Sequence, residues 1–65
     1  MTEDKWFDED TRAVKYYDYS NGTINIAIFS EKAWEFEKNL WKEKDLNMTF
    51  ETFVRARLEL GGVKA

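Results

Sequence analysis

The chain has 65 residues and contains neither Cys nor His. Disulfides and Cys/His zinc sites are therefore excluded, and a domain of this size buries only about 60% of the surface that its unfolded chain exposes. Such a domain usually needs very regular packing or self-association for stability. No stretch approaches the ~20 apolar residues of a membrane span, and the acidic N-terminus does not resemble a secretory signal. We therefore expect a cytoplasmic protein with no membrane segment.

The net charge of -3 is distributed unevenly. Residues 1–10 hold five acids against one Lys, whereas the remaining residues hold nine Lys and Arg against eight acids. A block of like charge is typical of a solvated arm. We predict an acidic flexible arm over 1–10, a single domain over 11–62 and a short tail over 63–65.

Aromatic side chains make up 17% of the chain, and each can bury roughly 150–250 Å². A core of this size cannot enclose all of them, so we expect some to lie at a partner surface. A homodimer is the simplest such partner. The aromatic residues that we expect at an interface are Trp6, Phe7, Tyr16, Trp34 and Trp41.

The first elements predicted along the chain form a β-hairpin. Residues 11–19 are rich in β-formers, Asn21-Gly22 suits a two-residue type I′ turn, and residues 23–29 alternate with period two. This turn would place Tyr19 opposite Ile24, Tyr17 opposite Ile26 and Lys15 opposite Ile28. The Ile face would then gain two Tyr rings, and we expect it to face the core.

Two helices follow. Ser30 is a suitable N-cap for a helix over 31–44, in which Ala33, Phe36 and Leu40 form an apolar stripe. After a connector over 45–48, Thr49 is a suitable N-cap for a second helix, which Gly61-Gly62 ends. The predicted fold class is α+β, a hairpin followed by two helices (ββαα).

The chain offers little for catalysis. His and Cys, which are the most common general base and the strongest nucleophile, are missing, and the two serines have structural roles as turn and cap. The carboxylates show no spacing that would hold a metal, and no Gly-rich phosphate loop precedes a helix. We expect no enzymatic activity, no cofactor and no metal.

The stretch 23–60 resembles a ribbon-helix-helix protein. Ile24-Asn25-Ile26-Ala27-Ile28 matches the short alternating strand, Ser30-Glu31-Lys32 matches the opening of the first helix, and the run from Thr49 to Arg55 matches the opening of the second. The resemblance implies an obligate dimer in which strands from two chains pair and read base edges in the major groove of duplex DNA.

Carried over by position, the resemblance assigns DNA-binding roles to particular residues. Thr23, Asn25 and Ala27 would form the reading face, and the amide of Asn25 suits adenine. The backbone N–H groups near Thr49 and Phe50 would hold a phosphate, with Lys15 and Arg12 as basic contacts. The resemblance thus implies a dimeric, repressor-like regulator of transcription.

An alternative interpretation is a small protein-binding module, such as an inhibitor or adaptor of a phage or mobile element. The acidic arm, the nearly neutral body and the excess of aromatic residues favour it, since aromatic side chains are enriched at interface hot spots.

Overall fold

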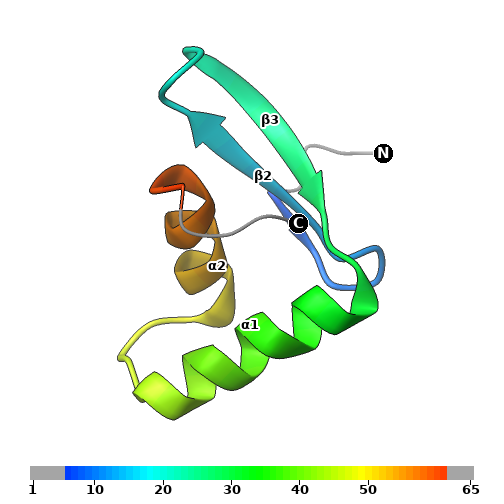
Figure 1. Ribbon diagram of the computed structural model, residues 1–65, viewed down its shortest axis with the longest axis vertical. Coiled ribbons are helices and arrows are strands. Elements are labelled where there is room, and N and C mark those ends of the chain that lie inside the picture. Colours follow the sequence, from blue (N-terminus) through cyan, green and yellow to red (C-terminus); the bar gives the residue numbers. More distant parts are fainter. Residues whose placement is uncertain (1–5, 62–65) are drawn as a thin grey trace.

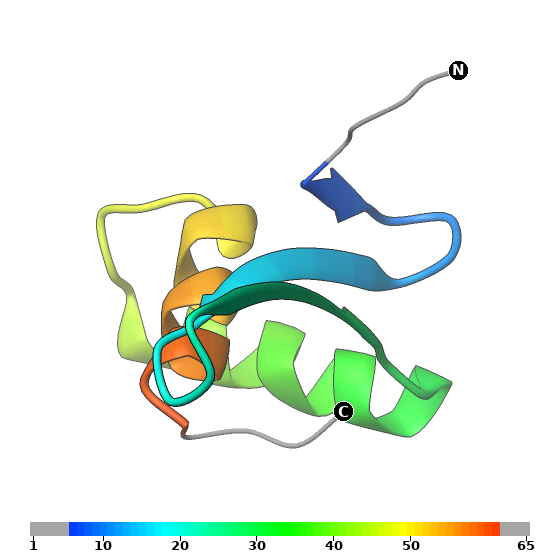
Figure 2. The ribbon, with the colours of Figure 1, turned by 90° about the horizontal axis from the view of Figure 1, so that it is seen from above.

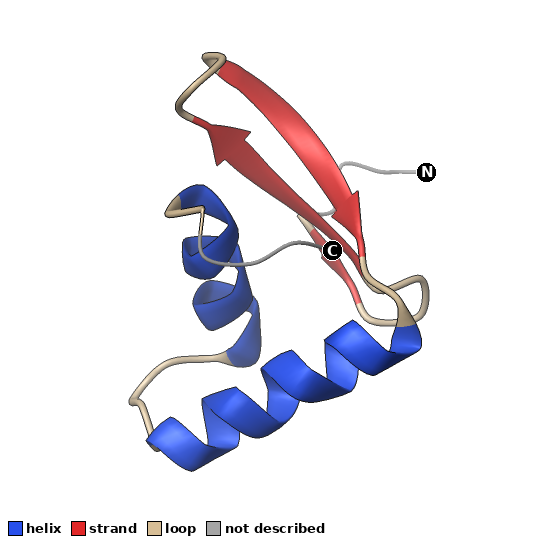
Figure 3. Ribbon diagram, in the orientation of Figure 1, coloured by secondary structure: helices blue, strands red, loops and turns tan. Residues whose placement is uncertain are grey.

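The computed structural model describes residues 6–61, and the strands and helices follow one another as a sheet and then a helix pair (Figures 1 and 3). The strands are β1 (Phe7–Asp8), β2 (Ala13–Asp18) and β3 (Thr23–Ile28). The helices are α1 (Glu31–Lys44) and α2 (Phe50–Glu59). The α+β class and the two helices after the hairpin agree with the prediction, whereas the sheet has a third strand.

The additional strand comes from the predicted acidic arm. Phe7 pairs with Val14 and Asp8 with Ala13, so that the antiparallel sheet has the order β1-β2-β3 (Figure 2). The second half of the predicted flexible arm is therefore part of the fold, while residues 1–5 and the predicted tail over 63–65 lie outside the described residues. Phe7 brings its ring to 5.5 Å from the Trp34 ring, which fixes this strand to the core.

The hairpin is present, but its register differs from the predicted one by two residues. Tyr17 pairs with Ile24, and Asp18 pairs with Thr23, which leaves four residues in the loop. Asp18 causes this longer turn: its carbonyl accepts from the N–H groups of Asn21 and Gly22, and its carboxylate accepts from Ser20 and the Asn21 amide. Only Gly22 of the loop has a positive φ, of 68°, whereas a type I′ turn would require one at Asn21 as well.

Both helices begin at the predicted caps. The Ser30 hydroxyl accepts a hydrogen bond from Ala33 N, and the Thr49 hydroxyl accepts one from Thr52 N, so each satisfies an N–H group that has no partner within the helix. Asp45, in a left-handed conformation with φ of 52°, ends α1, and Gly61, with φ of 76°, follows α2. The prediction of residues 31–44 as a helix is confirmed.

The core lies between one face of the sheet and the helices. α2 packs against β2 on this face, and no helix within residues 6–61 lies on the opposite face (Figure 1). Pairing places Phe7, Val14 and Ala27 in one row across the covered face, and Phe29, two residues after Ala27, lies on the same face. The buried apolar side chains are Val14, Phe29, Trp34, Phe50, Phe53, Val54 and Leu58.

Two predictions about the core are wrong. The Ile face points away from the helices, because the sheet contributes Val14 and Phe29 to the core and packs Ala27 against it. On α1, Trp34 and Glu37 are buried while Phe36 is 60% exposed, so the buried stripe is rotated from the predicted one. The sheet therefore has an apolar face that the helices do not cover.

Asp18 makes the hairpin sensitive to acid. The Ser20 hydroxyl donates to Asp18 Oδ1 at 2.6 Å, and this bond lowers the pKa of Asp18 below its ordinary value of 3.8, aided by bonds from Asn21 and opposed by desolvation. Because the folded-state pKa is lowered, the carboxylate stabilises the fold above pH 3.8 and loses that effect as pH falls through the folded-state value. We expect Asp18→Ala to lower the melting temperature at pH 7, and the difference from wild type to shrink towards pH 2.

Thermal unfolding followed by circular dichroism at both pH values measures this difference. Asp10→Ala, which removes an exposed acid from the loop between β1 and β2, serves as the control and should change stability less. An Asp18→Ala deficit of equal size at both pH values would contradict the role assigned to the carboxylate.

Candidate protein-binding surface

The uncovered face of the sheet carries an apolar surface, which we call the open face. Alternation along β2 and β3 directs Tyr17, Ile24, Ile26 and Ile28 to this side, since Tyr17 pairs with Ile24 and Ala13 with Ile28. The ring of Tyr19 joins them, with its centroid 4.7 Å from that of Tyr17 in an edge-to-face contact. The open face consists of Tyr17, Tyr19, Ile24, Ile26 and Ile28.

All three Ile side chains of the open face, which lie along β3, are largely exposed. Ile24, Ile26 and Ile28 are 54%, 61% and 66% exposed, whereas a buried Ile contributes about 1.5–3 kcal/mol relative to an exposed one. Towards β1 the same face becomes polar, because Lys15 pairs with Ile26 and Asp8 pairs with Ala13. The apolar surface is therefore a stripe at one side of the sheet.

The same strand has a free hydrogen-bonding edge. Phe29 N donates to Arg12 O, so the odd-numbered residues of β3 direct their backbone groups towards β2. The N–H and C=O groups of Ile24, Ile26 and Ile28 consequently point away from the sheet. No strand pairs with this edge within the part of the chain that the structure describes.

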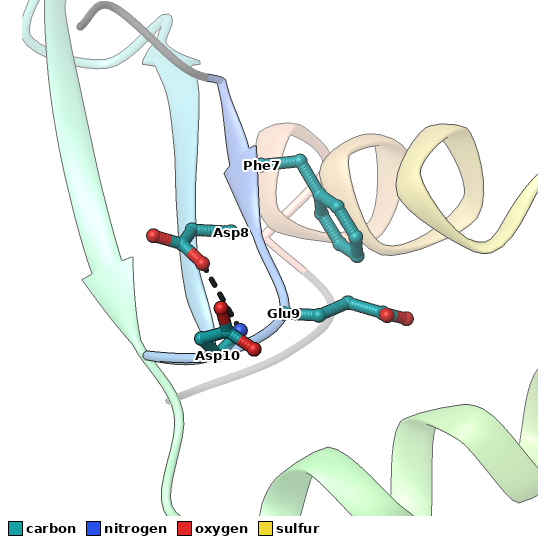
Figure 4. A pocket seen from close by; sticks show the side chains of 4 residues that line it. All are labelled: Phe7, Asp8, Glu9 and Asp10. Carbon is teal, nitrogen blue, oxygen red and sulfur yellow. Dashed lines mark hydrogen bonds between the residues drawn. The ribbon is translucent and has the colours of Figure 1, made fainter. Parts of the chain in front are cut away.

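A hollow at the other end of the sheet is acidic. Phe7, Asp8, Glu9 and Asp10 line it, and Asp8 Oδ1 accepts a hydrogen bond from Asp10 N at 3.0 Å (Figure 4). This bond lies at the start of the loop that joins β1 to β2. Among the described residues, no group of three or more potential ligands is arranged to hold a metal ion.

A second hollow lies between the start of β1 and α2. Trp6 lines it together with Glu51, Arg55 and Glu59. Lys15 Nζ lies 5.3 Å and Arg55 Cζ 5.8 Å from the centre of the Trp6 ring, and Glu59 accepts a hydrogen bond from the backbone N–H of Tyr17. These contacts occupy the edge of β2 where β1 no longer covers it, so this edge is less available than that of β3.

The predicted DNA-reading face is not an exposed surface. Ala27 packs against the core, and the half-buried Asn25 donates its amide to Asp18 Oδ2 at 3.0 Å, while only Thr23 is exposed. The reason is that odd-numbered residues of β3 lie on the helix-covered face. Of the three residues, only Thr23 therefore presents an exposed side chain, and their role in reading DNA stays a prediction.

The predicted phosphate contacts have structural roles. Arg12 adopts φ of 58° and donates from Nε to Phe29 O at 3.0 Å, and Lys15 lies over Trp6. The hydroxyl of Thr49 accepts from Thr52 N at 3.2 Å, and the Phe50 side chain is buried. The side chains of these four residues are thus used within the fold.

Of the predicted interface aromatics, one lies mainly at the surface. Trp6 is 39% exposed, whereas Trp34 is only 5% exposed, so that little of the Trp34 side chain is accessible to a partner. Phe7, Tyr16 and Trp41 are half-buried and pack against the core, and the Trp41 indole N–H donates to Met48 O. The alternating Ile residues, which the sequence did place on one face, are accessible instead.

A buried ion pair, which the sequence did not indicate, joins the two helices. Arg57 donates from Nε to Glu37 Oε1 at 2.5 Å and from Nη2 to Oε2 at 3.0 Å, and Glu37 is only 1% exposed. This bidentate geometry fixes the angle between α1 and α2 as well as their separation.

Because Glu37 is buried, removal of its partner should be costly. We expect Arg57→Ala to lower the free energy of unfolding by about 3 kcal/mol, since a carboxylate would remain buried without its counter-charge. The double variant Glu37→Met/Arg57→Met should recover most of that loss, because it removes both charges and keeps side-chain volume. Urea unfolding measures both values.

The pair between Arg55 and Glu51 provides a matched control, because it joins residues four apart on the surface of α2 at 3.0 Å. Arg55→Ala should cost less than about 1 kcal/mol. An Arg57→Ala variant no less stable than Arg55→Ala would contradict a structural role for the buried pair.

Comparison with known proteins gives no family for this chain. No protein-family model, no curated protein and no solved structure matches it. Among the described residues, no helix is both long and apolar enough to cross a membrane.

Proposed function

We propose that this chain is a small protein-binding module whose binding surface is the open face together with the free edge of β3. The observation that carries the proposal is the exposure of Ile24, Ile26 and Ile28 beside unpaired backbone groups. Contiguous apolar surface of this kind is typical of interaction sites, and a free strand edge supplies backbone donors and acceptors for an added strand.

The chemistry of the open face suits a protein partner. Tyr17 and Tyr19 flank the Ile residues, and Tyr combines a large apolar ring with a hydroxyl that can form hydrogen bonds at the rim of an interface. Self-association, which the size of the chain favours, is one form of such binding. The expected absence of catalysis agrees with this proposal.

The geometry supports DNA binding less well. Affinity for DNA depends largely on cationic contacts to phosphate, and the chain has a net charge of -3. The strand residues that a ribbon-helix-helix protein would direct to bases lie on the covered face of this sheet. No charged side chain belongs to the stripe along β3.

Site-specific photo-crosslinking tests the proposal. A photoreactive amino acid at position 26 should give a protein adduct in the native host, whereas the same group at Leu60 should not. Leu60 is the matched control because it is 86% exposed, lies at the end of α2 and is not part of the open face.

The identity of the adduct separates the possible outcomes. A protein adduct at position 26 alone supports the proposal, whatever the mass of the partner. A nucleic-acid adduct, equal adducts at both positions or no adduct at position 26 would contradict it.

A further inference from the structure

We propose that the occupant of the β3 edge is a second copy of this chain, paired antiparallel with a twofold axis at Ile26. The inference rests on the proposed function and names its partner. It would join two three-stranded sheets into one continuous sheet, with both pairs of helices on the same face.

The backbone of β3 matches this arrangement. The outward groups belong to Ile24, Ile26 and Ile28, which are evenly spaced about Ile26. Antiparallel pairing would place Ile26 opposite Ile26 of the second copy and Ile24 opposite its Ile28. Each of these would be a hydrogen-bonded pair that exchanges two N–H···O bonds.

The side chains match it as well. A twofold axis perpendicular to the sheet keeps the Ile residues of both copies on one face, so each Ile side chain would lie beside another across the new strand pair. Apolar β-branched pairs across strands stabilise a sheet by roughly 0.2–1 kcal/mol each. The apolar stripe, which ends abruptly at the free edge in one chain, would lie at the centre of the combined sheet.

The edge also lacks the features that keep sheet edges apart. Natural edge strands usually carry Lys, Pro, a bulge or an inward charge. β3 has the sequence Thr-Ile-Asn-Ile-Ala-Ile, with none of these residues and an uninterrupted pairing with β2. No like charges would face one another across the axis, so nothing in the strand opposes its own pairing.

Self-complementarity favours a second copy over a foreign strand. Asn25 and Ala27 flank Ile26, and Ile24 and Ile28 lie one position further out. The outward-directed residues are all Ile, so their order is the same in both directions along the strand. A closed twofold contact needs this property, because the same surface must serve both partners. A 65-residue domain also gains from association, since its own core is small.

The chain has no Cys, so one introduced thiol reports the register directly. Ile26→Cys should oxidise to a disulfide-linked dimer, because directly opposite Cα atoms in a hydrogen-bonded pair are about 5.5 Å apart, within disulfide range. Ile24→Cys should not, because its two thiols would be separated by about 13 Å along the strands. Crosslinking of Ile24→Cys in preference to Ile26→Cys would contradict the twofold axis at Ile26.

Sedimentation equilibrium of the purified full chain tests the dimer itself. Wild type should have about twice the chain mass of 7.8 kDa at micromolar concentration, and Ile26→Lys should have the mass of one chain. Leu60→Lys, an exposed apolar residue changed in the same way, should remain dimeric. Circular dichroism establishes that each variant is folded.

The results separate the two proposals. A wild-type chain that remains monomeric at all concentrations would overturn the second-copy assignment. If that chain still gave an adduct with another protein at position 26, the protein-binding proposal would stand without it. A monomer with no adduct would overturn both.

Discussion

Burial of Val14 and Phe29 beneath the helices determines which face of the sheet remains accessible. These two side chains are 0% and 1% exposed, and period two along β3 then forces Ile24, Ile26 and Ile28 to the opposite side. A strand cannot bury both faces when helices cover only one. The apolar surface of this domain is thus a direct consequence of how its core is built.

The ion pair between Glu37 and Arg57 supports that arrangement from the helical side. α2 packs against β2, and Arg57 of α2 forms a bidentate bond with the buried Glu37 of α1, which joins the two helices. The aromatic cluster around Trp34 and Phe50, whose ring centroids are 5.1 Å apart, completes the contact. Removal of one charge of this pair would leave the other buried without a partner.

Local signals in the sequence predicted the helices well, because hydroxyl caps at Ser30 and Thr49 act within a few residues. The hairpin was also predicted, but its register was not, because the carboxylate of Asp18 organises a longer loop than Asn-Gly alone would. The alternation of residue types over 23–29 identified the Ile face, but it did not indicate which face of the sheet the helices cover. Glu37 and Arg57 are separated by 20 positions and resemble surface charges in sequence, so only the packed structure brings them together.

Hydrogen exchange at the free edge tests the central claim, that a partner strand covers β3. If it does, the amides of Ile24, Ile26 and Ile28 will exchange as slowly as those of Asn25 and Ala27, which already face β2, and their protection will fall on dilution. Fast exchange of the three Ile amides at every protein concentration, with slow exchange at Asn25 and Ala27, would contradict the claim.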